Sequence, residues 1–357
     1  MCHKTEWRPA MNEELNIHEI HLGFPYDKCM LINFLAKHHL TFEEDIEAAF
    51  GVFDSDENLV GCGCCAGNLL KCFAVDESLR GQNALGSLVS RLVDNRFQNG
   101  HYDLFVMTRP KNKAMFTSCG FYPLAETESV LMLENKRNGL EKFYKRMIPG
   151  GAEHFDHTST GGVGCIVMNC NPFTKGHQAL IEFAASHCDL LHIFVVEENR
   201  SAFPFSVRLH LVKEGTAHLP NVRVYPSGPY MISSATFPTY FLKEGEDAAA
   251  IQSALDITLF ASKIAPIFGI TKRFAGEEPL DPVTRKYNEA MMHLLPQYNI
   301  SFIKIDRIQS DGPDVKPEVI SASRVRKILA EHGVTDEVLA LVPPCTAEYL
   351  KNEFKGF

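Results

Sequence analysis

The chain has 357 residues, which is too long for one typical domain and long enough for two domains that each bury a core. Its formal net charge of −9 argues against general binding to nucleic acid or to an anionic membrane, because both need a basic surface. The first residues carry no apolar signal segment, and the longest apolar runs have the length of strands. We therefore expect a soluble, cytoplasmic protein.

Cysteine is frequent, with eleven in the chain, and four of these residues cluster at Cys62, Cys64, Cys65 and Cys72. Their spacing lacks the paired C-x2-C of a zinc site, and they alternate through two expected strands. Small buried thiols in a reducing compartment explain this pattern better than a metal site does. No structural metal is expected.

The first part of the chain, to about residue 137, mixes short strands and helices in an α+β order. Turn residues at 54–58 separate two apolar runs, which predicts a hairpin. Apolar residues at i, i+3 and i+4 predict a longer helix further on. The expected elements are strands at 46–53, 59–67, 69–75 and 102–108 and helices at 85–93 and 113–119.

Two segments of this part, 75–81 (VDESLRG) and 115–123 (MFTSCGFYP), resemble the GNAT acetyltransferase family. The resemblance implies a fold that binds acetyl-CoA, with its pyrophosphate on the backbone N–H groups of an R-G-x-G-x-G/A turn. Here Asn83 and Leu85 occupy two positions that should be small, so their side chains would crowd the pyrophosphate. A role in structure or partner recognition is at least as consistent as acetyl transfer.

The predicted domain boundaries follow from composition. A helix at 141–147 and a glycine-rich run form a connection, so the GNAT-like domain covers 1–137 and the linker covers 138–162. From 163 to 357 strands and helices alternate, which predicts a Rossmann-like parallel sheet with helices on both faces. Its expected strands are 164–168, 190–196, 222–225 and 300–306, with helices that include 206–214 and 263–267.

The segment 163–182 (VGCIVMNCNPFTKGHQALIE) combines a buried strand, a polar turn and an amphipathic helix. The turn contains Asn171, and Gly176 allows a ligand to approach the backbone closely. Thr174 and His177 lie three residues apart at the helix start, where unsatisfied N–H groups favour an anion. We interpret this turn as a phosphate cradle; from these residues alone, an ordinary turn with a surface histidine is the alternative.

A second helix start lies at 319–326 (VISASRVR), with Ser321 or Ser323 as the expected N-cap and Gly333 as the stop. Hydroxyls, N–H groups and Arg326 make a second anion site, although a capped amphipathic helix alone would explain the serines. The two segments resemble the T/H-x-G-H and I-S-S-T-x-x-R signatures of the nucleotidyltransferase superfamily, in the order that the superfamily uses.

Two stretches lie between these motifs. Gly276, followed by Glu277, ends an expected strand and would let a base or ribose lie on the backbone. The run 230–243 (YMISSATFPTYFLK) is rich in hydroxyls and ends at Lys243. It is either the polar rim of a pocket or a plain loop before a helix.

These stretches together resemble the citrate lyase ligase family, at 168–177 (MNCNPFTKGH), 230–243, 276–279 (GEEP) with 282–288 (PVTRKYN), and 320–326 (ISASRVR). The likeness covers nearly the whole chain, because that family also has an acetyltransferase-like domain in front. It implies that ATP, acetate and a thiol on the acyl carrier subunit of citrate lyase give an acetyl thioester, AMP and pyrophosphate. The implied intermediate is acetyl-adenylate.

The resemblance also implies roles for residues of this sequence. His177, Thr174 and Arg326 are expected to stabilise the leaving pyrophosphate, with Mg²⁺ bridging phosphate oxygens. Nucleotide contacts are expected from Asn171, Gly176, Gly276, Glu277, Ser321, Ser323 and Arg326. Weaker candidates for contacts with acetate, the carrier or phosphate are Ser233, Thr236, Lys243, Arg208 and Lys175.

The sequence leaves three alternatives open. A nucleotidyltransferase of the phosphopantetheine or nicotinamide mononucleotide type would ignore acetate. An N-acetyltransferase would act through the first domain, and its activity would be retained in the His177→Ala variant. A non-catalytic adaptor would bind a partner without consuming ATP.

Overall fold

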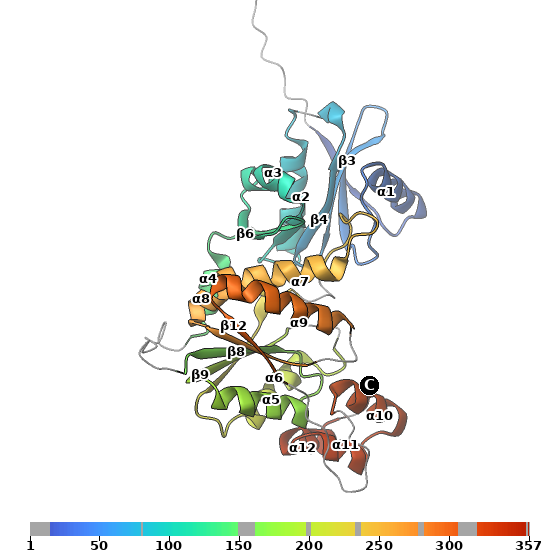
Figure 1. The fold of residues 1–357 in the computed structure, drawn as a ribbon. Coiled ribbons are helices and arrows are strands. Elements are labelled where there is room, and N and C mark those ends of the chain that lie inside the picture. Colours follow the sequence, from blue (N-terminus) through green and yellow to red (C-terminus); the bar gives the residue numbers. More distant parts are fainter. Residues whose placement is uncertain are drawn as a thin grey trace, which may run out of the picture. The chain divides into compact units, whose positions relative to one another are not determined.

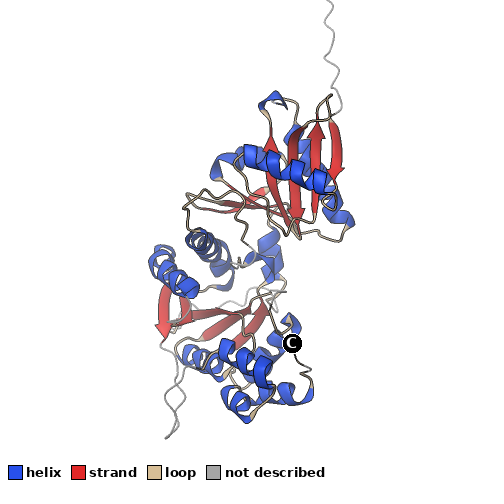
Figure 2. Ribbon diagram, turned by 90° about the vertical axis from the view of Figure 1, so that its right-hand side faces the viewer, coloured by secondary structure: helices blue, strands red, loops and turns tan. Residues whose placement is uncertain are grey.

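The computed structural model describes residues 15–79, 81–148, 161–197, 201–232, 237–277, 282–305, 320–354 and 356. The chain divides into two compact units, the first formed by 1–139 with 238–248 and the second by 140–237 with 249–357. Each unit has its own sheet with helices packed against it (Figures 1 and 2).

This division differs from the predicted boundaries in two places. Helix α4 (Gly139–Lys145), which we predicted to lie in a linker, buries Tyr144 completely in the second unit. The segment 238–248 belongs to the first unit, although the sequence places it within the second predicted domain. Local composition cannot reveal either assignment, because both depend on packing between residues far apart in the chain.

The first unit contains a seven-stranded mixed sheet in the order β1-β2-β3-β4-β5-β7-β6. Neighbouring strands are antiparallel except β4 and β5, which are parallel. Helix α1 lies on one side of the sheet and α2 and α3 lie on the other (Figure 1). The strands are β1 Asn16–Ile20, β2 Ala48–Phe53, β3 Leu59–Ala66, β4 Leu69–Val75, β5 Phe105–Thr108, β6 Tyr122–Glu126 and β7 Leu131–Glu134, and the helices α1 Pro25–Lys37, α2 Ala84–Gln98 and α3 Lys113–Ser118. The predicted α+β class is confirmed.

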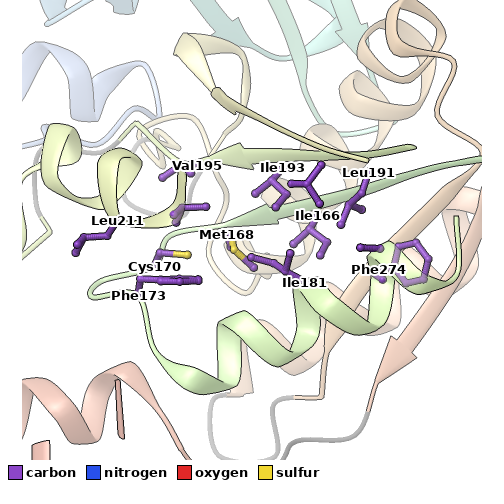
Figure 3. Packing of buried hydrophobic residues seen from close by; sticks show 14 of the residues in the cluster. Ile166, Met168, Cys170, Phe173, Ile181, Leu191, Ile193, Val195, Leu211 and Phe274 are labelled. Atoms are coloured by element: carbon purple, nitrogen blue, oxygen red, sulfur yellow. The ribbon is translucent and has the colours of Figure 1, made fainter. Parts of the chain in front are cut away.

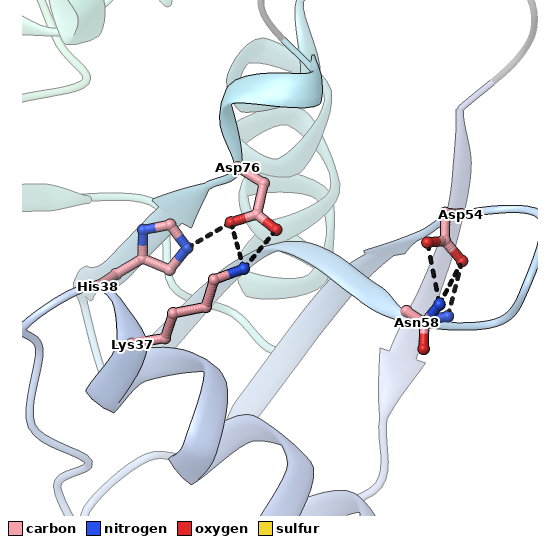
Figure 4. Close-up of polar contacts among 5 residues, drawn as sticks. All are labelled: Lys37, His38, Asp54, Asn58 and Asp76. Atoms are coloured by element: carbon pink, nitrogen blue, oxygen red, sulfur yellow. Dashed lines mark hydrogen bonds and ion pairs between the residues drawn. The ribbon is translucent and has the colours of Figure 1, made fainter.

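Polar contacts in this unit fix its turns and helix ends (Figure 4). The Asp54 carboxylate accepts hydrogen bonds from the backbone N–H groups of Asp56 and Asn58 at 2.9 and 2.8 Å, which confirms the predicted hairpin turn. The bond from the Asn58 backbone is the largest of the contacts that lower the pKa of Asp54. Lys37 and His38, at the end of α1, both contact Asp76 at 2.9 Å, just beyond β4.

The four clustered cysteines lie in β3 and β4, where their side chains are fully buried and form no disulfide. In the described part of the chain no three His, Cys, Asp or Glu side chains group as a metal site would need. These thiols therefore act as small core residues in the structure.

The second unit contains a five-stranded parallel sheet in the order β10-β9-β8-β11-β12. The predicted Rossmann-like sheet is confirmed, and helices cover both of its faces (Figure 1). Its strands are β8 Val163–Met168, β9 Leu190–Val195, β10 Val222–Pro226, β11 Lys272–Gly276 and β12 Ser301–Ile305. Besides α4, its helices are α5 Lys175–Ser186, α6 Phe205–Gly215, α7 Ala248–Leu259, α8 Ala265–Phe268, α9 Pro282–Leu294, α10 Ala322–His332, α11 Asp336–Leu341 and α12 Pro344–Asn352.

Side chains alternate between the two faces of this sheet. Ile166, Ile193 and Phe274 pack with Ile181 of α5 and Leu211 of α6 (Figure 3). On the opposite face, Phe194 packs against Tyr144 and Phe268 in edge-to-face contacts, with ring centroids 6.0 and 5.0 Å away. Burial on both faces explains why the strands are continuous apolar runs in the sequence.

One helical run, 248–268, is long and apolar enough to be a membrane-span candidate among the described residues. Its most apolar window is 61% buried inside the protein, so it is a core helix in this structure. The run joins α7 to α8 through one π-helical turn, Phe260–Ile264.

Candidate functional site

A cavity of about 510 Å³ opens at the carboxyl edge of the parallel sheet, between β8 and β11. The chain moves outward from β8 to β9 and β10, then returns to the other side of β8 to form β11 and β12. The cavity therefore lies at the topological switch point, where open α/β sheets bind ligands. Its walls include the ends of both strands and the starts of α5 and α10.

Thr174 and His177 form a reciprocal cap at the start of α5. The Thr174 hydroxyl accepts the His177 backbone N–H at 3.4 Å, and His177 Nδ1 accepts the Thr174 backbone N–H at 3.1 Å. Because Nδ1 is an acceptor, the proton of the neutral imidazole lies on Nε2. Both residues line the cavity, so the ring can present an N–H donor there.

Gly176 brings the two predicted motifs together. A Cβ atom at this position would lie 3.1 Å from the backbone oxygen of Ile320, so a larger residue would press on the segment that leads into α10. Ser321 caps α10 by accepting the Arg324 backbone N–H at 3.2 Å, and it also lines the cavity. Two helix starts with unsatisfied N–H groups thus share one cavity.

Arg326 and Asn171 lie behind this wall. The Arg326 guanidinium donates to the backbone oxygen of Asn171 and, at 3.2 Å, to the hydroxyl of Ser323. Burial lowers the pKa of Arg326. The Asn171 side chain accepts the Phe203 backbone N–H at 2.9 Å. None of these three side chains is part of the cavity wall, so they support the loop between β8 and α5.

Gly276 and Glu277 form the end of β11 and line the cavity. Among the described residues, a Cβ atom at Gly276 would meet only Leu180, at 3.9 Å. Its carbonyl accepts the Asn288 side-chain N–H at 3.1 Å. Glu277 pairs with Lys304 at 2.9 Å.

Among the weaker candidates that the structure describes, Arg208, Lys243 and Lys175 do not line this cavity. Arg208 is fully buried, and its guanidinium donates to the backbone oxygens of Phe203, Asn169 and Val196 at 3.0, 2.7 and 2.9 Å. The Arg208 guanidinium therefore lies among backbone oxygens and is not part of the cavity wall. Lys243 belongs to the first unit, and Lys175 is exposed at the start of α5. Ser233 and Thr236 lie outside the described residues.

The structure adds a buried polar cluster that the motifs did not identify. Arg273 and Tyr287 line the cavity, and the Tyr287 hydroxyl donates to Asp256 at 2.5 Å. Burial is the largest influence on Asp256 and raises its pKa, although the bond from Tyr287 acts in the opposite direction. In the sequence, Tyr287 falls within the stretch 282–288 that carries the family resemblance, and Arg273 is a charged residue just before Phe274, but neither is among the predicted site residues.

The first unit has a cavity of its own, of about 1360 Å³. Strands β4 and β5 pair only at Leu69–Phe105 and Leu70–Val106, and the cavity opens beyond these pairs, beside Val75 and Thr108. Residues 240–244 and Glu246 line it, with Tyr240 donating to the Met107 backbone oxygen at 2.8 Å.

The doubly wound parallel sheet, with two helix starts at its switch point, defines a Rossmann-like domain with a candidate ligand site at the carboxyl edge of its strands. Residues 163–350 match the family model for the citrate lyase ligase C-terminal domain. The Klebsiella pneumoniae protein named citrate (pro-3S)-lyase ligase is 39% identical over 326 residues, which is 89% of this chain and 90% of that protein. The Escherichia coli K12 protein of the same name is 38% identical, over 90% of each chain.

The chain therefore belongs to the citrate lyase ligase family, and the protein is an enzyme of the ligase class. Among solved structures, a GNAT-family acetyltransferase from Staphylococcus aureus is 14% identical, with a TM-score of 0.29. That likeness covers 34% of this chain and 99% of the acetyltransferase.

Proposed function

We propose that the protein activates acetate with ATP and transfers the acetyl group to a thiol on the acyl carrier subunit of citrate lyase. Family membership supports the overall reaction. The activation of the acid by ATP is supported by the close approach of Gly176 to the backbone of Ile320. This approach brings the starts of α5 and α10 to one cavity. We place this reaction in the cytoplasm.

In the first step, a carboxylate oxygen of acetate forms a bond to the α-phosphorus of ATP. The bond from this phosphorus to the oxygen bridging to the β-phosphate breaks, and its electron pair leaves with pyrophosphate. No proton is transferred in this step, so donors and positive charge are needed rather than a base. His177 would donate from Nε2, and the N–H groups at the starts of α5 and α10 would donate to the phosphate oxygens.

In the second step, the sulfur of the carrier thiol forms a bond to the acetyl carbon. The bond from that carbon to the phosphate oxygen breaks, AMP leaves with the electron pair, and the thiol proton passes to water. The thiol belongs to the carrier's prosthetic group. The cysteines of the second unit's core, such as Cys165 and Cys170, are fully buried, and burial raises the pKa of both.

Mg²⁺ fits this cavity as an ion held mainly by phosphate oxygens. Among the described residues on the cavity wall, Glu277 is the single carboxylate, and a phosphate-bound Mg²⁺ needs no more than one or two. Such an ion would neutralise charge on the pyrophosphate. Phosphate positioning otherwise depends on the helix starts and on His177.

The test is acetate-dependent exchange of labelled pyrophosphate into ATP by the purified protein. His177→Ala should reduce this exchange by roughly 10², the scale seen when a donor to developing charge is removed. His210→Ala is the matched control, because His210 is an exposed histidine on α6, away from the cavity, and it should leave the rate unchanged.

Exchange that runs equally well without acetate would contradict acid activation and favour nucleotide transfer. Acetyl transfer that needs acetyl-CoA and no ATP would assign the activity to the first unit. The Asn83 side chain argues against the latter, because it lies over the start of α2, 2.5 Å from where a Cβ on Gly86 would be. A gain of one acetyl group by the deacetylated carrier tests the second step.

A further inference from the structure

Arg273 is a buried charge on the wall of the switch-point cavity. Its side chain is 4% exposed and belongs to β11, where it pairs in register with Cys165 of β8. Its guanidinium donates to the Cys165 sulfur at 3.2 Å and lies 4.7 Å from the ring centroid of Phe260. Phe260 begins the π-helical turn after α7, so this turn supplies the ring that covers one side of the guanidinium.

This environment does not neutralise the positive charge. A thiol is a weak acceptor and an aromatic ring is a weak partner, whereas a guanidinium carries five N–H donors. Among the described residues no carboxylate lies within 4 Å of the Arg273 nitrogens. Removing a charge from water without a close counter-ion is costly, so a fold that retains it leaves a place for an anion.

Asp256 belongs to the same cluster, and each of its two oxygens already accepts a hydrogen bond from another group. One accepts the Ile232 backbone N–H at 2.7 Å, and the other accepts the Tyr287 hydroxyl at 2.5 Å. Asp256 and Arg273 influence each other through space, without a direct ion pair. Arg273 lines the cavity together with Ala275 and Met291.

We propose that Arg273 binds the carboxylate of the acid substrate. The inference rests on the proposed function and adds the residue that recognises the acid. The bidentate fork of a guanidinium matches a carboxylate, and one carboxylate oxygen would remain turned toward the α-phosphorus. The buried site between two strands suits a small monoanion, whereas the phosphates of ATP have their own donors at His177 and Ser321.

Arg273→Met tests the proposal because it removes the charge and keeps much of the side-chain volume. In the pyrophosphate exchange assay, the KM for acetate should rise roughly 100-fold, as expected when one partner of a buried charge pair is lost, and the KM for ATP should stay near its original value. Arg273→Lys should give an intermediate KM for acetate, because it keeps the charge without the fork. Arg223→Met, on the exposed part of β10, is the matched control and should change neither constant.

A binding measurement without turnover separates recognition from folding. Sodium acetate should raise the Tm of the unaltered protein relative to sodium chloride at the same concentration, and it should not raise the Tm of Arg273→Met. Equal increases in the KM for acetate and for ATP, or an unchanged KM for acetate in a folded Arg273→Met, would overturn the proposal. Acetate-independent exchange by the unaltered protein would contradict the proposed function instead, and the Tm comparison would still test the anion subsite.

Discussion

His177 and Arg208 act on the site at different distances from the cavity. His177 lines the cavity and has its tautomer fixed by the Thr174 N–H. Arg208 does not reach the cavity, yet it holds the backbone at Asn169 and Val196, just beyond β8 and β9. A variant of Arg208 should therefore affect activity only through the position of these loops.

His192 makes the stability of the second unit depend on pH. It is 2% exposed on β9, near Phe268 and Tyr225, and burial lowers its pKa to about 4. The unfolded chain binds this proton near pH 6.5, so the unfolded state carries more bound protons between pH 6.5 and 4. The contribution of the neutral His192 to the free energy of unfolding is fully present above pH 6.5. It decreases as the pH falls from 6.5 toward 4.

Urea unfolding as a function of pH measures this effect. Each unit of pKa difference between the unfolded and folded states corresponds to about 1.4 kcal/mol, so the free energy of unfolding should be lower by about 3 kcal/mol at pH 4 than above pH 6.5. His192→Leu should remove that part of the acid sensitivity, whereas the exposed His332→Leu should retain it. An acid dependence of the same slope in both variants would show that other groups cause it.

How much of the site could be read from sequence differs from residue to residue. Thr174, Gly176, His177 and Ser321 stand at helix starts, and helix starts have local signals in capping residues and glycine. Arg273 has no such signal, because its position against Cys165 depends on the pairing of β11 with β8. The burial of Arg208 could not be predicted for the same reason, since the backbone oxygens of Asn169 and Val196 that its guanidinium contacts come from other parts of the chain.

At the scale of elements, local patterns predicted the strand and helices that carry the two anion-site motifs. The predicted strand 164–168 and the predicted helix after it correspond to β8 and α5, and the predicted stop at Gly333 is the C-cap of α10. Helices α7 and α9 were not predicted. Helix α7 is apolar around much of its surface and so lacks clear amphipathic spacing.

The N-cap of α5 offers a test of whether a cap near the cavity does more than stabilise its helix. Thr174→Val removes the hydroxyl that accepts the His177 N–H, and Thr335→Val removes the equivalent acceptor at the start of α11. Each change should lower the free energy of unfolding by about 1 kcal/mol. Only Thr174→Val should also slow pyrophosphate exchange.

Urea unfolding and the exchange assay on both variants give the comparison. The matched loss of stability makes Thr335→Val a control for the general effect of losing a cap. If both variants exchanged pyrophosphate at the original rate, the Thr174 hydroxyl would have only a structural role.

At the scale of the whole molecule, the first unit is built from two separate parts of the chain. Tyr240 and Phe241 are 3% and 6% exposed, and the Tyr240 carbonyl accepts the Thr41 backbone N–H at 2.9 Å. Arg109 donates to the Phe241 carbonyl at 3.1 Å and also pairs with Glu246. The chain therefore passes between the two units three times, near 139, 237 and 248.

A protein truncated to 140–357 should keep its parallel sheet but lose the partners of 238–248. Amide hydrogen exchange at 239–242 should become much faster in this truncation than in the full chain, because the contacts with Thr41, Met107 and Arg109 are gone. The amides of β8 serve as the internal control and should stay protected. Unchanged protection at 239–242 would mean that the segment folds without the first unit.

The passage of 238–248 into the first unit also has a consequence for synthesis on the ribosome. Domains usually fold in order as the chain emerges, the N-terminal one first. Here the first unit cannot acquire its last segment until 140–237, with β8, β9 and β10, has been translated. The first unit therefore remains incomplete while the first strands of the second sheet are translated. It can complete its fold only after residue 248 has left the ribosome.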